Sequence, residues 1–480
     1  MAASTVKEDD PVEPLERDDI QGLVASGYAE MAETRYLLLE ILEPRAAARW
    51  LESLADRITS SREPETVRCL NVAFTAAGLT ALGVQIDDLR TFAAPFQEGI
   101  TSPNRQRVLG DTGPSHPQNW EWGGLGLEPA TVGRLHVLLM IYARDEVAIH
   151  HVLGEETARS AQDGALGVLR TLAPEALPGV QRLGKFGVEH FGFADGMSQP
   201  VIKGLGSVQD LAPEDVARHV IAPGEFVLGY PNGHGELTPS PRLSLHQGTT
   251  DVGRNGSYLV VRQLAQDVWS FRQLLATAAA DDPEDPDAAE RLAAKLIGRW
   301  RSGAPVTSNP HQDAPGAGGD NSFGYAKTDL HGEGCPLGAH IRRSNPRDAL
   351  GHTSGAEALR RANLHRIIRR GRVYGAGLPD EATGPDKTDR GLIFMCVNAN
   401  IERQFEFIQQ SWCNNPKFAG LYEEQDPILG SPPEAKGIFT VQGSPIAIRQ
   451  RGLRSYVTVR GGGYFFLPGV RALRALAALH

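Results

Sequence analysis

The stretch "FGFADGMSQP" places one carboxylate, Asp195, in an otherwise apolar or neutral segment, with Gly192 and Gly196 on either side. An aspartate between glycines is ordinary turn chemistry, so the segment alone predicts a turn. Phe191 and Phe193 are close in sequence, and their rings predict a partly dry environment. Such a setting suits proton transfer, which makes Asp195 a candidate general acid or base.

A second candidate is His340, in "GCPLGAHIRRSNPRD". A neutral imidazole is the commonest axial ligand of haem iron in proteins. Since the chain has 14 histidines, the default for any one of them is a hydrogen-bonded core residue. Cys335, five residues earlier, offers a thiolate as the alternative ligand. There is no CxxCH motif, so a haem held here would be bound non-covalently.

A third candidate is the arginine cluster in "HRIIRRGRVYG", which has four arginines within seven residues. Such a cluster usually forms a solvent-exposed face or phosphate contacts. An arginine held in an apolar setting beside a catalytic carboxylate would instead stabilise negative charge that develops on an oxygen. The residues themselves leave both interpretations open.

The charge balance excludes several classes of partner. The chain has 58 acidic and 48 basic residues, a formal net charge of -10. This argues against a general nucleic-acid binder or a binder of anionic membranes, because phosphate contacts need a basic face. No apolar run approaches the length that spans a bilayer. The N-terminus is acidic and polar, unlike a secretory signal, so we expect a disordered lead-in and a cytoplasmic protein.

Motif searches exclude several common chemistries. The four cysteines are scattered without CxxC spacing, which argues against structural zinc and a disulfide framework. The nucleotide, zinc-protease and serine-hydrolase patterns are also absent from the sequence: GxGxxG after a strand, GxxxxGK[ST], HExxH and GxSxG.

The elements that must position these candidates follow a repeated pattern. Four short apolar runs are typical of buried strands, and each leads into a segment with apolar residues at helical spacing. The pattern occurs once before about residue 200 and again after about residue 220, which predicts two similar α+β units. Antiparallel sheets with helices on one face fit best, because strands and helices do not alternate strictly. The four runs are "RYLLLEIL", "HVLLMIYA", "SYLVVRQL" and "LIFMCVNA".

Two further segments complete this outline. "SYVTVRGGGYFFLPG" predicts a hairpin that precedes a closing helix, "VRALRALAAL". The segment 302–336 is rich in Gly, Pro, Asn and Asp and predicts a long loop, which inside a compact domain is usually functional or disordered.

With these stretches together, the sequence resembles the dye-decolorising peroxidases, a haem peroxidase family. The family signature GxxDG is matched by Gly192 to Gly196. Each matching motif is weak alone, but the ordered set is specific and runs over most of the chain from about residue 30. The motifs are "WEWGG", "HVLLMIYAR", "FGFADGMSQP", "PGEFVLGYPN", "GRWRSGAPV", "CPLGAHIRRSNPRD", "RIIRRGRVYG", "GLIFMCVNANIERQFEFIQQSW" and "DPILG".

The resemblance implies a pair of ferredoxin-like α+β domains, with antiparallel sheets packed against helices and haem held mainly by the C-terminal domain. We therefore expect a disordered segment over 1–20, a first domain carrying GxxDG over 21–210, and a haem-binding domain over 211–480. The long loop and the insert "PDEATGPDKTDR" match the loop-rich branches of the family.

The resemblance also implies roles for individual residues. His340 would be the proximal ligand of the haem iron, while Asp195 and Arg369 would lie on the distal face. His365 lies too close in sequence to Arg369 to occupy the opposite face. Asp426, in "DPILG", would accept the other imidazole proton of His340 and make the ligand more electron-donating.

Two more assignments follow from the same resemblance: Phe394 would line the distal cavity, and Arg342 would reach a haem propionate. Electron relay through an aromatic residue near the surface is a further role to consider, but for Trp412, Tyr374 and Tyr230 we favour core packing.

The implied function is that of a haem-dependent peroxidase with one non-covalent haem b per chain. It would reduce hydrogen peroxide and oxidise dyes, phenols or similar one-electron donors, with neither nucleic acid nor membrane as partner. The alternatives are a haem-handling or haem-sensing protein with incidental peroxidase activity, and a cofactor-free protein acting in binding or assembly. The sequence leaves open the oligomeric state, including a homo-oligomer.

Overall fold

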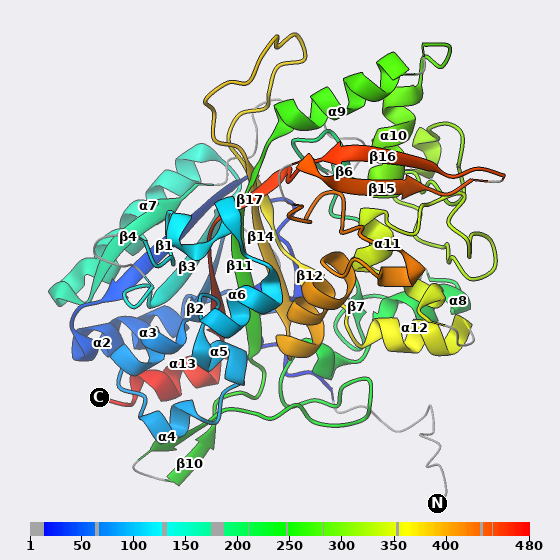
Figure 1. The fold of residues 1–480 in the computed structure, drawn as a ribbon. Helices are drawn as coiled ribbons and strands as arrows, with labels where there is room; N and C mark the ends of the chain where they lie inside the picture. The colour runs from blue at the N-terminus through cyan, green and yellow to red at the C-terminus, as the bar shows by residue number, and fades with distance from the viewer. Residues whose placement is uncertain are drawn as a thin grey trace, which may run out of the picture.

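The fold is α+β and is organised around one large antiparallel sheet (Figure 1). The sheet has nine strands, in the order β12-β14-β11-β17-β2-β3-β1-β4, with β13 paired to β14 beside β12. The computed structural model describes residues 14–62, 67–126, 132–173, 187–209, 211–245, 248–281, 283–351, 355–432, 435–443 and 445–480.

The first half of the sheet is a ferredoxin-like unit. Its strands lie side by side in the order β2-β3-β1-β4, and every pair is antiparallel. Two helices connect the strands in the sequence βαββαβ, which is the ferredoxin-like arrangement. The elements are β1 (Glu33–Ile41), α2 (Pro44–Ala55), β2 (Arg68–Phe74), β3 (Val137–Ala143), α7 (Glu146–Ala161) and β4 (Leu166–Leu172).

The second half repeats this order. Two short strands, β12 and β13, share the place that β2 has in the first half, and the spatial order is again second, third, first, fourth. The elements are β11 (Ser257–Gln266), α9 (Val268–Asp281), β12 (Ile368–Arg369), β13 (Arg372–Tyr374), β14 (Gly391–Asn398), the π-helical turns η7 (Glu402–Glu406) and η8 (Ile408–Cys413), and β17 (Val457–Leu467). The duplicated α+β fold expected from the sequence is thus confirmed.

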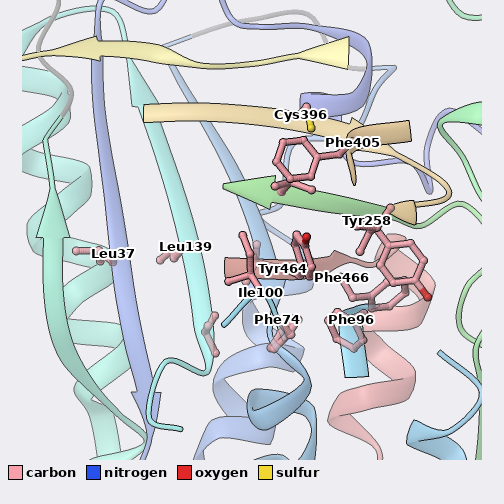
Figure 2. Close-up of a cluster of buried hydrophobic side chains, with 14 of the residues drawn as sticks. Leu37, Phe74, Phe96, Ile100, Leu139, Tyr258, Cys396, Phe405, Tyr464 and Phe466 are labelled. Atoms are coloured by element: carbon pink, nitrogen blue, oxygen red, sulfur yellow. The ribbon is translucent and has the colours of Figure 1, made fainter. Parts of the chain in front are cut away.

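The two halves join where β17 meets β2, through the pair Phe466 and Phe74. Figure 2 shows side chains of both halves gathered at this junction. The Phe92 ring lies 5.2 Å from that of Phe466, and the Phe96 ring lies 5.7 Å from that of Tyr258. A short backbone contact is therefore supported by an aromatic core that spans the junction.

One face of the sheet is covered by helices of both halves, which share a continuous apolar core. Helix α13 (Val470–Ala477), which ends the second half, packs against α2 of the first half. The opposite face is covered by the segments 20–31 and 221–230. Both faces of the sheet are thus buried, as the nearly unbroken apolar runs in β3 and β11 require.

The N-terminal expectation is only partly correct. Residues 1–13 lie outside the described residues, but disorder is the wrong prediction for residues 14–20. Ile20 is fully buried, and the Asp19 carboxylate accepts hydrogen bonds from Asn255 Nδ2 at 2.7 Å and Arg471 Nε at 3.0 Å. These long-range contacts tie the segment to the body of the protein.

The hairpin expected in "SYVTVRGGGYFFLPG" is also wrong, because this segment forms the single strand β17. Its glycines serve close packing rather than a turn. A Cβ on Gly461 would lie 2.4 Å from Nε1 of Trp122, so only glycine lets the indole approach the strand.

The remaining elements are short and surround the cavity described below or cover the core. The two-stranded hairpin of β15 (Gly437–Val441) and β16 (Ile448–Leu453) projects beside α10 and α11 (Figure 1). None of the helices within the described ranges has the length and apolar character needed to cross a membrane. These elements are α1 (Gly22–Ala25), α3 (Ala76–Ala81), α4 (Ile86–Leu89), α5 (Ala94–Glu98), α6 (Pro103–Leu109), β5 (Gly187–Val188), β6 (Ala194–Asp195), β7 (Val201–Ile202), α8 (Pro213–His219), β8 (Val220–Ile221), β9 (Arg242–Leu245), β10 (Gly248–Asp251), α10 (Ala288–Ile297), α11 (His340–Ser344) and α12 (Gly355–Asn363).

Candidate active site

A cavity of about 320 Å³ lies between the second half of the sheet and the loops that precede and follow it. This volume is within the range of ligand-binding cavities. The cavity brings together Asp195, His340, Arg369 and Phe394, four of the residues singled out in the sequence. They come from β6, α11, β12 and β14, so residues far apart in the chain meet at one place.

His340 is the first residue of α11, and its imidazole lines the cavity. Nδ1 of the ring lies 2.9 Å from Oδ2 of Asp426, whose side chain is fully buried. Because Nδ1 is engaged, Nε2 is the ring nitrogen left for a ligand. The sequence resemblance placed a carboxylate behind this histidine, and the structure has Asp426 there.

Asp426 is held in place by its own loop. Oδ1 accepts hydrogen bonds from the backbone N–H groups of Ile428 and Leu429, both at 2.9 Å. Burial alone would raise the pKa of Asp426, but the charge and hydrogen bond of His340, together with the Leu429 amide, lower the pKa below its ordinary value. Burial alone would lower the pKa of His340, and Asp426 raises it. The pair therefore favours an ionised carboxylate that accepts the Nδ1 proton.

Asp195 and Arg369 meet on another wall of the cavity. Nη1 of Arg369 donates to Oδ1 of Asp195 at 3.1 Å, and Nη2 donates to the backbone oxygen of Met197 at 2.6 Å. The backbone N–H of Arg369 donates to Oε1 of Gln199 at 3.0 Å. One guanidinium thus fixes both the carboxylate and the chain that follows it.

The loop that carries Asp195 differs from expectation in one respect. The Asp195 side chain is 43% exposed, so the partly dry environment predicted from Phe191 and Phe193 is not found around this carboxyl group. The carboxyl group of this loop whose burial raises the pKa is Glu189, which the sequence did not single out. Phe191 and Phe193 both line the cavity: the Phe191 ring lies 4.6 Å from the Phe271 ring, and the Arg301 guanidinium lies 5.1 Å from the Phe193 ring.

Apolar side chains form the broad walls of the cavity. Phe394 lines it, as expected, and lies 6.1 Å from the ring of Phe405. Phe405 belongs to η7, where the π-helical turns deliver further apolar side chains to the same space. The other apolar lining residues include Phe191, Phe193, Ala194, Met197, Leu264, Ile297, Ile341, Ile367, Leu392, Ile408, Ile428, Leu429 and Val457.

Besides Arg262, which is paired with Asp111, three buried arginines line the cavity: Arg299, Arg347 and Arg366. Their guanidinium groups donate to backbone oxygens and to side chains such as Asn321 and Ser198, and no ion pair with a carboxylate is found for them among the described residues. Burial lowers the pKa of Arg366 to about 9 and that of Arg299 to about 10. Buried positive charge without a counter-charge is costly, so the arginine cluster calls for an anionic group.

Arg342, the arginine expected to reach a haem propionate, points away from the cavity. It does not line the cavity, and its guanidinium donates to Asp329 Oδ2 at 3.3 Å and to the backbone oxygen of Cys335 at 2.8 Å. It also lies 4.3 Å from the Tyr325 ring. On α11, His340 faces the cavity while Arg342, two residues further, faces the interior of the long loop, because residues two apart on a helix do not share a face.

The alternative iron ligands are not placed to serve. Cys335 is buried outside the cavity lining, and burial raises the pKa of its thiol to about 11, which disfavours a thiolate. His365 is stacked on Phe407 at 3.9 Å, with its Nδ1 2.5 Å from the backbone oxygen of Arg403, so it is a packed core histidine. The aromatic residues considered for electron relay, Trp412, Tyr374 and Tyr230, are all buried.

Sequence reasoning missed Glu189 and the arginine cluster. Arg347 and Arg366 belong to the basic runs "IRRSNPR" and "HRIIRRGR", and Arg299 belongs to "GRWRSG". The runs themselves were a usable signal, but which arginine turns inward depends on loop geometry. Arg347, for example, has a φ of 52°, which local sequence rules would not predict for an arginine.

These residues fit haem. An apolar cavity suits the porphyrin, His340 backed by Asp426 suits an axial iron ligand, and the uncompensated arginine cluster suits two propionates. The duplicated ferredoxin-like fold and this cavity define the class of the protein as one whose cavity fits a haem.

Comparison with known proteins leads to the same class. The chain is 31% identical over 461 residues to a dye-decolorizing peroxidase of Mycena epipterygia. The aligned residues make up 87% of this chain and 78% of the relative. It is 30% identical over 487 residues to the multifunctional dye peroxidase DyP2 of Amycolatopsis sp., covering 94% and 91% of the two chains. The chain belongs to the dye-decolorizing peroxidase family.

A solved structure agrees over almost the whole length. A dye-decolorizing peroxidase in complex with 2,6-dimethoxyphenol superposes with a TM-score of 0.77 at 27% identity, covering 97% of this chain and all of that one. No family model matches the chain.

Proposed function

We propose that this peroxidase reduces hydrogen peroxide at a haem bound in the cavity and oxidises dyes, phenols or similar one-electron donors. The observation that carries the proposal is the meeting of His340 with its carboxylate partner and the Asp195 and Arg369 pair in one cavity. Peroxide cleavage needs an iron ligand, a proton carrier and a fixed positive charge, and these residues supply all three.

The proposed cofactor is one non-covalent haem b per chain. His340 would ligate the iron through Nε2, and Arg347, Arg299 and Arg366 would hold the propionates. When bound, haem supplies the redox chemistry, by taking up two oxidising equivalents from peroxide and passing them to donors one electron at a time. Asp426 would keep the His340 imidazole oriented and electron-rich by accepting its Nδ1 proton.

Asp195 is proposed as the proton carrier. Oδ1 accepts from Arg369 Nη1 at 3.1 Å and from the Gly196 N–H at 2.6 Å, so Oδ2 is the oxygen left to exchange a proton. Asp195 would take the proton from the inner oxygen of peroxide and return it to the outer oxygen, directly or through a water, so that water can leave.

Arg369 is proposed to stabilise the negative charge that develops as the O–O bond breaks. Its guanidinium is already oriented by Asp195 and by the backbone oxygen of Met197, so little reorganisation is needed when charge appears. Phe394 would shape the space beside these two residues and limit the size of molecules that reach them.

The donors are proposed to be small phenols or dyes. The structurally similar peroxidase solved with 2,6-dimethoxyphenol supports this class of donor. An aspartate carries protons at lower pH than a histidine does, so dye oxidation is expected to be fastest under acidic conditions. A cytoplasmic location stays a prediction.

The test is peroxide turnover with a dye, measured for the parent and for Asp195→Asn across the acidic range. The variant should keep its Soret band and lose at least 100-fold in the rate of reaction with peroxide. An unchanged pH profile in Asp195→Asn would overturn the assignment. A haem-handling protein, the alternative function, would bind haem but give no sustained turnover with either a dye or a phenol.

A further inference from the structure

Glu189 lies on the wall of the cavity, six residues before Asp195, and its carboxylate is saturated with N–H donors. Oε1 accepts from the backbone N–H of Phe193 at 2.9 Å. Oε2 accepts from the backbone N–H of Phe191 at 2.8 Å and from Nε2 of Gln266 on β11 at 2.7 Å. One side chain thus bridges the loop to the central sheet.

These bonds close a tight turn. The backbone N–H of Glu189 donates to the Phe193 oxygen at 3.0 Å, and the Gly192 N–H donates to the Glu189 oxygen at 2.8 Å. Gly192 has a φ of 95°, and a Cβ there would lie 2.3 Å from Nη1 of Arg301. The turn is therefore fixed by the Glu189 carboxylate on one side and by Arg301, which donates to the Phe191 oxygen, on the other.

The turn leads directly into the strand pair that ends at Asp195. Strands β5 and β6 pair antiparallel, with Gly187 opposite Asp195 and Val188 opposite Ala194. This pair has only two residues in each strand, too few to hold its own register, so the turn between the strands sets it together with the bond from the Ala194 N–H to the Arg301 oxygen at 3.0 Å. A displacement of the turn would move the Asp195 carboxylate away from Arg369.

The chemistry of the clamp requires a carboxylate. Both of its oxygens face N–H donors, and an ionised carboxylate accepts on both. An amide in its place would direct an NH2 group at one of these donors and leave that donor without a partner. Burial raises the pKa of Glu189, so three hydrogen bonds are what keep this carboxylate in place against the cost of burying it.

We propose that Glu189 is a positioning residue for Asp195: its carboxylate clamps the turn 189–193 and thereby sets where the Asp195 side chain enters the cavity. This inference rests on the role proposed above for Asp195. It assigns Glu189 no contact with peroxide, so the effect of Glu189 on the reaction with peroxide would pass through Asp195.

The test is a double-mutant cycle on the haem-loaded protein, with Glu189→Gln, Asp195→Asn and the double variant. Glu189→Gln should keep its haem content and slow the reaction with peroxide at least tenfold. In the Asp195→Asn background the same change should cost less than twofold, because the residue that it positions is already disabled. An equal cost in both backgrounds would overturn the proposal.

Hydrogen exchange gives a readout that does not depend on the role of Asp195. The amides of Phe191 and Phe193 should exchange at least tenfold faster in Glu189→Gln, measured by mass spectrometry on the peptide that covers 187–196. Unchanged exchange would show that no clamp exists, even if Asp195→Asn abolishes turnover. Conversely, full activity of Asp195→Asn with faster exchange in Glu189→Gln would sink the proposed role of Asp195 while leaving the clamp intact.

Glu156→Gln is the matched control. Glu156 is a fully buried glutamate on α7, paired with Arg57 at 3.0 Å and Arg159 at 2.7 Å, and it lies outside the cavity lining. Neutralising it should lower stability but leave both the peroxide reaction and the exchange of the 187–196 peptide unchanged. A slowed peroxide reaction in this control would mean that loss of any buried glutamate has the effect ascribed to Glu189.

Discussion

Nδ1 of His340 lies 2.9 Å from Oδ2 of Asp426, although 86 residues separate them in the chain. The other oxygen of Asp426 accepts two backbone N–H bonds from the turn that follows it. Because the carboxylate is held by its own backbone, it can in turn hold the imidazole in one orientation. A carboxylate that accepts the Nδ1 proton raises the basicity of the nitrogen that binds a metal.

Asp426→Asn should therefore change the electronic properties of the haem iron without preventing haem from binding. The variant should bind haem, raise the Fe(III)/Fe(II) reduction potential, and lose about 10-fold to 100-fold in activity, the range typical for partners of metal ligands. Spectroelectrochemistry of the holoprotein measures the potential directly. Glu424→Gln is the control, since Glu424 is a buried carboxylate of the same loop that binds Thr440 rather than His340. A potential equal to that of the parent in Asp426→Asn would contradict the role of the pair.

Arg347, one of the proposed propionate ligands, can be tested against Arg342, the residue expected in that role from the sequence, by comparing Arg347→Gln with Arg342→Gln. Arg347 lines the cavity and has no carboxylate partner among the described residues, whereas Arg342 is paired with Asp329 outside it. Arg347→Gln should weaken haem binding at least tenfold, measured by haem transfer to an acceptor protein. Arg342→Gln should lower the unfolding free energy by about 3–5 kcal/mol, since it leaves a buried carboxylate unpaired. Faster haem loss from the Arg342 variant alone, at equal stability, would restore the original expectation.

Arg369→Lys tests whether the fork of the guanidinium matters as well as its charge. Arg369 uses one Nη on Asp195 and the other on the Met197 oxygen, and an ammonium cannot span both in the same geometry. We expect a loss of about 10² in the rate of reaction with peroxide for Arg369→Leu, similar to removal of one oxyanion-hole donor, and a smaller loss for Arg369→Lys. Stopped-flow mixing with peroxide gives these rates. Equal rates in parent and Arg369→Leu would exclude charge stabilisation by this residue.

Much of the fold could be predicted because the central strands are long and apolar. Strands β1, β3, β11 and β14 coincide with the four apolar runs of the sequence. Such runs are expected because strands that are buried on both faces contain few polar residues. The short strands β12 and β13 have two and three residues and no pattern of their own, so they are defined only by their pairing with β14. The glycines of β17 misled because sequence rules associate them with turns, whereas Trp122 fills the space beside Gly461.

The candidate site could likewise be predicted only in part. His340, Asp195 and Arg369 were predicted because each lies in a motif with a family resemblance, and the structure brings them to one cavity. The expectation for Arg342 came from its place two residues after His340, but its guanidinium turns to Asp329 in the long loop, and no local pattern in the sequence shows this. Glu189 was missed because its role lies in hydrogen bonds to the backbone, which leave no spacing pattern in the sequence.

His219, at the end of α8, should limit stability in acid. Burial and the charges of Arg347 and Arg366 lower the pKa of His219 to about 4, while the Asn321 oxygen lies 3.2 Å from Nε2. The unfolded chain, with an ordinary histidine pKa of 6.5, then binds more protons than the folded chain between pH 6.5 and about 4, so the unfolding free energy falls as the pH falls through this window. His219→Gln cannot titrate and should lose less stability than the parent over the same range, whatever its stability at pH 7.5. Urea unfolding midpoints at pH 7.5, 5.5 and 4.5 measure this, and a constant difference between the two proteins at all three pH values would contradict the prediction.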